Sequence, residues 1–547
     1  MMTFEAGTVR EASDCQSHRA PQLSLTPFNL CLGLNANDYT AQKDQGFRFR
    51  TDRDPWPLKL PLDWRADERD DKNFNIQLHF WRMIDPIMRE WFVHPSSPLI
   101  GEMFQFARDW HRFHRHEACA NSWNDMAAGY RALRIAFFME RDRLDPGVFT
   151  DADRHVIADL FRSHSDYLMN PANWSVTNHG LFQALGNRIM HQQAGELAAN
   201  IPFVEASGQH MRKCLHNLFT DEGIQTEHSA GYHFFVTDAI RRCAIREVFP
   251  ELGDVVRIID LAEQNRAWLY FPDGMVSRVG DTRSLNDVTS FEVPDVQGGQ
   301  RWQFGDRSLD IGDFSRSGWT VVKSAVGTAL ERQCMLFFTA MNHGIAHKHA
   351  DDLSFELFEN GRHVLVDSGQ YAYSPNDEMK RYVTSAAAHN TVDLGDGPRD
   401  ETAAYGSGLN PVRTSKRAVV LSGEVLGRAG KFDHHRRLRY RPGLDLEICD
   451  VLDVAGRTPL ELCSRLHFAR GLDVRKEADG FSIRLHDKVV ARVSPPGGWS
   501  TESIFGRADP PLGWVTIGYK IMRPIWVIEA RRTVSKTVAR WRLTFPH

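Results

Sequence analysis

The spacing of apolar residues changes about halfway along the chain. From about residue 74 to 300 the helical period dominates, and Met126, Tyr130, Leu133 and Phe137 fall at i, i+4, i+7 and i+11 on one stripe of a helix. Such helices recur at intervals and are joined by short polar loops. The pattern therefore predicts helical hairpins stacked as a solenoid or toroid.

Two further signals fit helices in this half. Thr150 and Asp153 resemble a capping box, in which each side chain satisfies a backbone N–H of the other, ahead of an apolar stripe through Leu160. Ala239, Ile240 and their neighbours repeat the helical spacing. No strong sequence repeat accompanies these helices.

Beyond about residues 305 to 320 short apolar runs and alternation replace the helical spacing. In the clearest case, Trp541, Leu543 and Phe545 are apolar while Arg542 and Thr544 occupy the other face. Many short strands without intervening helices predict an antiparallel β-sandwich. The predicted strands are 319–326, 333–341, 353–358, 363–367, 418–425, 445–450, 462–468, 489–494, 526–531 and 538–545.

The chain is thus predicted to be α first and β second, in three parts. Residues 1–70 are expected to be irregular, since the proline-rich stretch 54–61 is incompatible with a regular helix. Residues 71–310 form the helical domain and residues 311–547 the sandwich. A chain of 547 residues also exceeds what one compact core accommodates.

Composition excludes some partners. The formal net charge of −4 provides no basic field, so nucleic-acid binding is not indicated. No run of about 18 apolar residues is present, so no membrane span is expected. The eight cysteines are scattered and read as reduced thiols. Residues 1–16 lack an apolar signal region, which leaves the location open between the cytoplasm and export by another route.

Candidate chemistry lies early in the predicted sandwich. Three histidines and two aspartates crowd residues 342–355, Asp367 ends a strand-like run, and His389 follows in Ala388–Val392. Imidazoles with a carboxylate are the ligands that zinc takes, with room for water. Because the chain has 24 histidines, a solvated polar loop is the alternative explanation of this cluster.

Geometry sets a condition on any shared metal. Glu359-Asn360-Gly361 is expected to form a three-residue hairpin loop that pairs Leu353 with Asp367. His349 would then lie four residues, roughly 13 Å, beyond Asp367 along the strand. A shared metal therefore requires the chain near Ala350 to bend back.

The helical half contains two polar stretches that are unusual for a core, residues 173–180 and 221–233. The structural explanation is that Asn173 or Thr177 caps a helix and that Tyr232 and His233 pack at a helix start. The functional explanation is a site that combines Asn, His and Tyr side chains.

Five motifs together resemble the heparinase II/III-like polysaccharide lyases, in the same order along roughly residues 70 to 470. This resemblance implies an incomplete (α/α) toroid followed by an antiparallel β-sandwich, which agrees with the architecture predicted from the apolar pattern. The motifs are Thr177–Gly180, Glu227–His233, His347–Asp351, Val366–Gly369 and Ala387–Thr391.

The resemblance also implies a reaction, β-elimination at C4 of a uronic acid. Asn178 matches the amide that neutralises the substrate carboxylate. Tyr232 matches the acid that protonates the leaving oxygen and, for one C5 epimer, removes the proton. His179 and His347 match active-site histidines that act as base or as assisting positive charge. A second phenol, Tyr371 or Tyr373, is left open.

The same resemblance implies a structural zinc held by His349, Asp367 and His389. The zinc is expected to position His347 and not to act as a Lewis acid on substrate. Lys348 departs from the pattern, because the family more often has a small residue between the two histidines. Two roles are considered for it: pointing to solvent, or contacting an anionic sugar.

Other function classes compete. A glycoside hydrolase on an α/α toroid would need two placed carboxylates, for which Glu222, Glu227, Asp351 and Asp352 are available. A zinc hydrolase would use His347, His349 and Asp367 as ligands. A non-catalytic carbohydrate-binding protein is the third alternative.

The expected partner is an acidic polysaccharide or oligosaccharide: glycosaminoglycan-like, alginate-like or an acidic exopolysaccharide. The sequence does not decide among these classes. Assembly as a homodimer is also left open.

Overall fold

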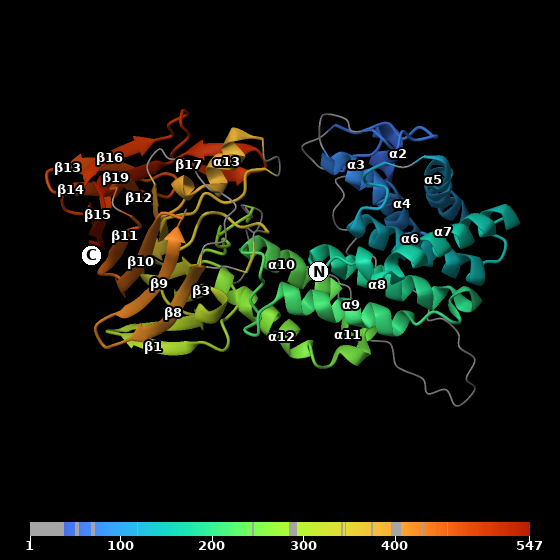
Figure 1. Ribbon diagram of the computed structural model, residues 1–547, viewed down its shortest axis with the longest axis horizontal. Helices are drawn as coiled ribbons and strands as arrows, with labels where there is room; N and C mark the ends of the chain where they lie inside the picture. Colours follow the sequence, from blue (N-terminus) through green and yellow to red (C-terminus); the bar gives the residue numbers. More distant parts are fainter. Residues whose placement is uncertain are drawn as a thin grey trace. The chain divides into compact units, whose positions relative to one another are not determined.

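The computed structural model confirms a helical part followed by a strand-rich part (Figure 1). Its last long helix ends at Asn265 and its first strand begins at Gln300. The residues that it describes are 38–49, 54–66, 72–117, 119–242, 245–283, 293–340, 343–344, 346–372, 376–394, 406–428, 430–456 and 458–546. Within them no helix combines the length and the apolar character that crossing a membrane requires.

The described helices are mostly 7 to 20 residues long. A short one, α2, lies within the segment 1–70 that was expected to be irregular. They are α2 (Tyr39–Gln45), α3 (Lys72–His79), α4 (Ile84–Val93), α5 (Ser97–His116), α6 (Asp125–Leu144), α7 (Asp151–Met169), α8 (Asn178–Gln193), α9 (Phe203–Leu218), α10 (Ala230–Arg242), α11 (Ile245–Val248), α12 (Val256–Asn265) and α13 (Glu378–Thr384).

Local sequence explains where these helices begin and how closely they pack. The predicted capping box is present, since Thr150 and Asp153 satisfy each other's backbone at the start of α7. Helices α6 and α8 touch through two glycines: a Cβ on Gly129 would lie 2.3 Å from the Phe182 carbonyl oxygen, and one on Gly186 would lie 2.3 Å from that of Gly129. Any larger residue would force the two backbones apart.

The strands of the described residues form four antiparallel sheets, and all ten predicted strand segments overlap observed ones. The six-stranded sheet runs β1-β2-β3-β4-β5-β6, the eight-stranded β13-β14-β15-β20-β11-β10-β9-β8, the four-stranded β16-β19-β12-β7, and the smallest pairs β17 with β18. Their bounds are β1 Gln300–Phe304, β2 Arg307–Phe314, β3 Trp319–Ser324, β4 Met335–Thr339, β5 Phe355–Glu359, β6 Arg362–Leu365, β7 Val392–Leu394, β8 Gly406–Thr414, β9 Val419–Arg428, β10 Phe432–Arg441, β11 Asp445–Val454, β12 Leu460–His467, β13 Asp473–Glu477, β14 Gly480–Leu485, β15 Lys488–Ser494, β16 Ser500–Phe505, β17 Trp514–Gly518, β18 Ile521–Pro524, β19 Trp526–Val534 and β20 Lys536–Thr544.

One apolar core joins the three larger sheets. Leu336 and Phe355 of the six-stranded sheet, Leu438 and Leu543 of the eight-stranded sheet and Ile528 of the four-stranded sheet all belong to it. The predicted sandwich is thus confirmed. The other face of the six-stranded sheet packs against α10 and the segment after α12, in a separate cluster.

The hairpin between β5 and β6 differs from its prediction. Glu359 pairs with Arg362, so the loop has two residues, and both Asn360 (φ 50°) and Gly361 (φ 77°) are left-handed, as a type I′ turn requires. A bulge between Leu357 and Phe358 shifts the register again. The predicted pairing of Leu353 with Asp367 is therefore wrong.

The chain divides into two compact units. One contains Met1–Cys214 and Arg242–Glu251, and the other contains Leu215–Arg241 and Leu252–His547. The second unit therefore includes α10 together with all the sheets, while Asn178 and His179 belong to the first. The ranges 71–310 and 311–547 stay a prediction about domains.

Candidate active site and metal centre

Tyr232 lies in the first turn of α10, which two hydroxyl groups hold in place. Its backbone N–H donates to Ser229 Oγ at 3.2 Å, and the N–H of Gly231 donates to Thr282 Oγ1 at 2.9 Å. These hydroxyls satisfy N–H groups that a helix start leaves without partners. The phenol therefore projects from a fixed point.

The imidazole of His347 stacks on the Tyr232 ring, with centroids 3.5 Å apart and planes 21° apart. The backbone that delivers it is unusual, because His347 (φ 55°) and His228 (φ 61°) are both left-handed. Gly280 fits between them: a Cβ there would lie 2.2 Å from the His228 oxygen and 3.1 Å from that of His347. Such conformations persist only where surrounding structure imposes them, and they are typical of functional sites.

Asp281, the next residue, joins the two histidines of the His-x-His motif. Its Oδ2 lies 3.1 Å from His347 Nδ1 and its Oδ1 lies 3.1 Å from His349 Nε2. A carboxylate only accepts, so each of these nitrogens carries the hydrogen. His347 Nε2 and His349 Nδ1 are then the nitrogens with a free lone pair, the first for a proton and the second for a metal.

Asp281 is held as an anion. Burial alone would raise its pKa, but the hydrogen bonds from His347 and His349 and the charge of Lys380 outweigh burial and hold the pKa well below its usual range. Lys380 projects from α13 and places Nζ 2.6 Å from Asp281 Oδ1. The anion favours the hydrogen-bonded orientation of both imidazoles.

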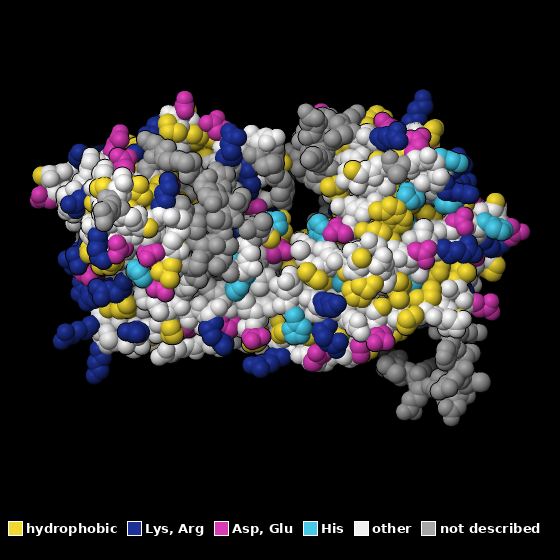
Figure 2. Space-filling view, viewed as in Figure 1, with side chains coloured by type: hydrophobic (Ala, Val, Ile, Leu, Met, Phe, Trp, Pro, Cys, Tyr) yellow, Lys and Arg dark blue, Asp and Glu magenta, His cyan; other side chains and the backbone are white. Residues whose placement is uncertain are grey.

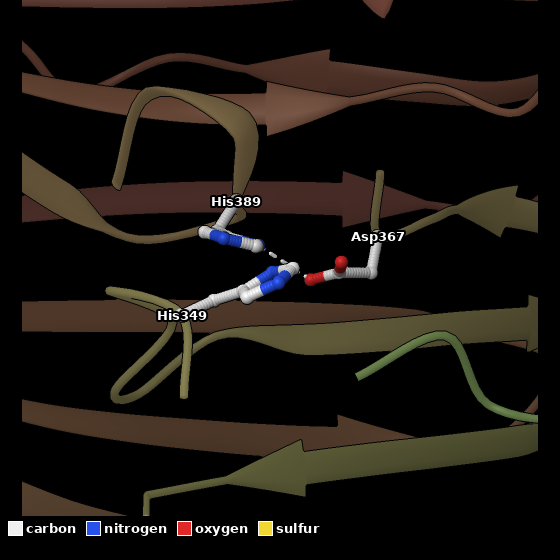
Figure 3. Close-up of side chains that lie close together, drawn as sticks. All are labelled: His349, Asp367 and His389. Atoms are coloured by element: carbon white, nitrogen blue, oxygen red, sulfur yellow. Dashed lines mark hydrogen bonds and ion pairs between the residues drawn. The ribbon is translucent and has the colours of Figure 1, made fainter. Parts of the chain in front are cut away.

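His349, Asp367 and His389 come together as predicted (Figure 3). One potential ligand atom from each lies within 4.8 Å of the others, and all three residues are buried. His389 Nδ1 lies 2.6 Å from Asp367 Oδ2. Among the described residues, this trio could hold a metal. The ligand set expected of a zinc hydrolase (His347, His349 and Asp367) is not brought together, because His347 is turned to Asp281.

The donor set suits a metal ion. His349 Nδ1 and His389 Nε2 are buried nitrogens without a hydrogen-bond partner, and leaving such groups unsatisfied is costly. Two imidazoles and one carboxylate leave a fourth tetrahedral position for water, which is a zinc arrangement. Other divalent metals that prefer imidazole fit the same donor set.

The bend required for this trio is present near Ala350. The Ala350 N–H donates to the Thr384 carbonyl at 2.8 Å, and that of Ser354 donates to the Asp351 carbonyl at 2.9 Å. Leu353 adopts φ 61°. The chain therefore turns sharply before β5, and this turn brings His349 back to Asp367.

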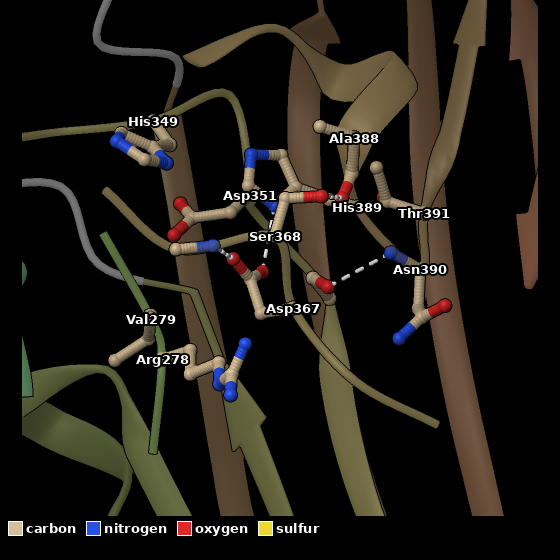
Figure 4. A network of polar contacts seen from close by, with 12 residues as sticks. Arg278, Val279, His349, Asp351, Asp367, Ser368, Ala388, His389, Asn390 and Thr391 are labelled. Atoms are coloured by element: carbon tan, nitrogen blue, oxygen red, sulfur yellow. Dashed lines mark hydrogen bonds and ion pairs between the residues drawn. The ribbon is translucent and has the colours of Figure 1, made fainter. Parts of the chain in front are cut away.

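The Ala-His-Asn-Thr motif does more than supply His389 (Figure 4). The fully buried Asn390 donates its amide hydrogens to the carbonyls of Phe355 and Val366, at 2.8 and 3.1 Å, and accepts from the N–H of His467 at 2.7 Å. It thereby ties together the ends of β5, β6 and β12. The loops that bear the predicted metal ligands are fixed by this side chain.

Comparison with known proteins identifies a family for the second half of the chain. A family model described as heparinase II/III-like, C-terminal, matches residues 306–540. Residues 306–540 thus form a heparinase II/III-like C-terminal domain. No curated protein matches the chain.

Solved structures share the fold of this chain. One titled heparinase III matches with a TM-score of 0.73 at 14% identity, over 97% of this chain and 87% of that one. The heparan sulfate lyase HepC from Pedobacter heparinus matches with a TM-score of 0.63 at 14% identity, over 98% and 85%. At this identity the likeness establishes the toroid-and-sandwich fold and not the activity.

Lys348, the residue between the two histidines of the His-x-His motif, takes neither of the two positions expected for it. Its Nζ lies 2.6 Å from Asp351 Oδ1 and 3.0 Å from Asp352 Oδ1, and its side chain is 8% exposed. It neutralises two buried carboxylates beside the metal ligands. Burial would raise the pKa of Asp351, but Lys348 and the nearby histidines lower it to about 2.

Asn178 and His179 lie in the other compact unit. Asn178 is the buried first residue of α8, capped by Thr177, and the half-exposed His179 places Nδ1 2.9 Å from Asp125 Oδ1. The prediction that these side chains share one site with Tyr232 and His347 stays a prediction.

Sequence reasoning missed Asp281 and Lys380, and it considered Glu227 only as a hydrolase carboxylate. Glu227 is buried, with Oε2 3.8 Å from His347 Nε2. The available signal for Asp281 was a Gly-Asp pair after a short apolar stretch, which is uninformative unless the histidines that contact Asp281 are known.

The sequence left open which of two tyrosines supplies a second phenol. Tyr371 packs beside the cluster of Tyr382 and Leu512, and Tyr373 lies outside the described residues.

Proposed function

We propose that this protein is a polysaccharide lyase that cleaves a uronic-acid-containing polysaccharide or oligosaccharide by β-elimination. The observation that carries the proposal is the phenol of Tyr232 stacked on an imidazole, that of His347, whose Nδ1 is held by Asp281. An acid and a base in contact are what an elimination needs. The family match and the titles of the structural relatives, heparinase III and heparan sulfate lyase, support the same class.

Each side chain has a stated part in this reaction. His347 Nε2 or the Tyr232 oxygen takes the proton from C5, and the Tyr232 hydroxyl protonates the oxygen that leaves C4. The Asn178 amide, assisted by His179, hydrogen-bonds the uronate carboxyl group and stabilises the enolate-like intermediate. Electrons from the broken C5–H bond form the C4–C5 double bond as the C4–O bond breaks.

The metal is proposed to be a structural zinc. His349, Asp367 and His389 would hold it, and when bound it supplies positive charge and fixed bonds to three chain segments. His349 donates to one oxygen of Asp281 and His347 to the other, so fixing the first imidazole also fixes the second.

The decisive test is Tyr232→Phe, assayed with a panel of uronate polysaccharides. Wild type should generate the ultraviolet absorbance of the unsaturated product, while the variant should lose activity about 100-fold or more because the proton donor is gone. Tyr39→Phe, on helix α2 of the other compact unit, is the matched control and should retain full turnover.

Other outcomes identify the alternatives. Reducing ends without double-bond absorbance would indicate a glycoside hydrolase. Binding of a polysaccharide by wild type and by Tyr232→Phe alike, with no product from either, would indicate a carbohydrate-binding protein. Wild-type turnover in Tyr232→Phe would refute the assigned role.

A further inference from the structure

The outer face of the eight-stranded sheet is lined with arginines. Along β10 the side chains alternate, so that Leu438 and Tyr440 enter the core while Arg437, Arg439 and Arg441 point outward. Arg540 and Arg542 of β20 and Arg413 of β8 lie on the same outer face. We call Arg413, Arg437, Arg439, Arg441, Arg540 and Arg542 the arginine face.

Strand register places these residues in rows. Arg437 pairs with Cys449, which pairs with Arg540, so one row carries two arginines two strands apart, roughly 10 Å. The next row, roughly 7 Å along the strands, carries Arg439 and Arg542 on either side of Glu447. Arg413 reaches this row through Val420. The charges therefore form a two-dimensional array.

The array is only partly neutralised. Arg441 and Arg542 both pair with Asp445, at 2.6 Å from Arg441 Nε to Oδ1 and 2.7 Å from Arg542 Nη2 to Oδ2, and Arg439 Nη1 lies 3.4 Å from Glu447 Oε2. Arg413, Arg437 and Arg540 are exposed, and none of the three forms an ion pair with another described residue. The outer face of the same sheet also carries Glu424, which pairs with His435, and Asp453, which pairs with Lys536. Within the arginine face, the charge left without an ion pair is that of Arg413, Arg437 and Arg540. Figure 2 shows Lys and Arg side chains gathered along the left edge, over β10 and β11.

We propose that the arginine face binds a carboxylated or sulfated polysaccharide chain, as a second contact for the polymer away from Tyr232 and His347. Guanidinium groups match carboxylate and sulfate oxygens in bidentate fashion. A flat array of them suits a linear polyanion better than a compact anion. The choice of polymer rests on the proposed function.

The composition of the face favours a polysaccharide over nucleic acid. The outward positions of β9, β10, β11 and β20 carry no Phe, Tyr or Trp, because Tyr440 and Trp541 of these strands lie in the core. Proteins that bind single-stranded nucleic acid rely on aromatic side chains that stack on bases. Recognition here is limited to charge, which a repeating anionic sugar supplies.

The test is the triple variant Arg413→Ser/Arg437→Ser/Arg540→Ser, compared with Arg112→Ser/Arg115→Ser on the exposed face of α5. Binding to immobilised heparin and to alginate is measured over a salt series. At low salt we expect the dissociation constant of the triple variant to rise about tenfold, with a shallower salt dependence than wild type, while the control variant binds like wild type.

Catalysis gives an independent readout. The triple variant should show a raised KM on long chains and unchanged turnover of a tetrasaccharide that is too short to span both contacts. Equal polymer binding by wild type and the triple variant would overturn the inference, as would tighter binding of a single-stranded oligonucleotide than of either polysaccharide. Polymer binding that needs the arginines, without any cleavage by wild type, would refute the lyase and leave this inference standing.

Discussion

At the scale of single residues, Asp281 determines which nitrogen of each imidazole is free. Asn in its place keeps the size but presents an N–H as well as an oxygen, so one histidine loses its acceptor and can adopt the wrong tautomer. We expect Asp281→Asn to lower kcat about 100-fold with little change in KM. The rate of double-bond formation, measured over a range of substrate concentrations, checks this.

The matched control is Asp273→Asn. Asp273 accepts from His363 Nε2 at 2.9 Å, a similar aspartate–histidine pair in the same unit, and its variant should keep wild-type kcat. A loss of kcat equal to that of Asp281→Asn would show that such pairs act through stability alone. Full kcat in Asp281→Asn would refute the orienting role.

Residues of the site differ in how far the sequence could reveal them. The association of His349, Asp367 and His389 was predictable from the resemblance of their motifs to a known family and not from spacing, since the expected hairpin register placed His349 roughly 13 Å beyond Asp367. Asp281 was not, because its role depends on partners 66 and 68 positions away. The position of Lys348 was not predictable for a related reason. Its partners Asp351 and Asp352 are close in sequence, but their burial depends on the turn at Ala350.

At the scale of secondary-structure elements, the β5–β6 hairpin carries a buried acid at its end. Glu359 accepts from the Tyr440 hydroxyl at 2.5 Å, and burial raises its pKa from 4.5 to about 7. A raised folded-state pKa adds stability that is complete below pH 4.5 and is lost as pH rises through about 7. As the pH rises from 4.5 through about 7, the loss of this contribution should therefore lower the free energy of unfolding by about 3 kcal/mol.

Glu359→Gln should remove that component of the pH dependence, because a neutral amide does not titrate. Urea unfolding at pH values below and above this window measures the difference between wild type and variant. Glu331→Gln, at an exposed position, should keep the wild-type profile. An unchanged slope in Glu359→Gln would contradict the assignment.

The predicted metal joins three segments: the turn before β5, the end of β6 and the segment before β7. A ligand that binds only the folded protein stabilises it by about 4 kcal/mol at 1,000 times its dissociation constant. Prolonged chelation should therefore lower the unfolding temperature by about 5 °C or more, and zinc should restore it while magnesium should not. An unshifted melting curve together with no zinc by elemental analysis would refute a structural zinc at this site.

Strands were predictable where apolar residues occupy the buried face, and not where charged residues occupy it. The ten predicted segments all coincide with strands. The neighbouring β10 was missed because two of its inward positions are His434 and Arg436, both buried and bonded to Asp450 at 2.9 and 2.6 Å. The β5–β6 register was wrong because the turn type and the bulge, not the apolar pattern, determine it.

At the scale of the whole molecule, the predicted catalytic residues are divided between the two compact units. Asn178 and His179 belong to one, and Tyr232 and His347 to the other. The sequence order of the motifs does not require this division, since the chain leaves the first unit at Leu215 and returns to it at Arg242. One active site from both units is thus a prediction about function that enzyme kinetics can test.

The prediction is that Asn178→Ala and Tyr232→Phe are strongly non-additive. If Asn178 stabilises the intermediate whose formation Tyr232 assists, the second substitution costs little once the first has removed the shared pathway. The loss of kcat/KM in the double variant should then be close to that of the worse single variant. Asn178→Ala combined with Tyr39→Phe is the control pair, and its effects should add. Additivity of Asn178→Ala with Tyr232→Phe would mean that the two units do not act on the same transition state, and the role given to Asn178 would fall.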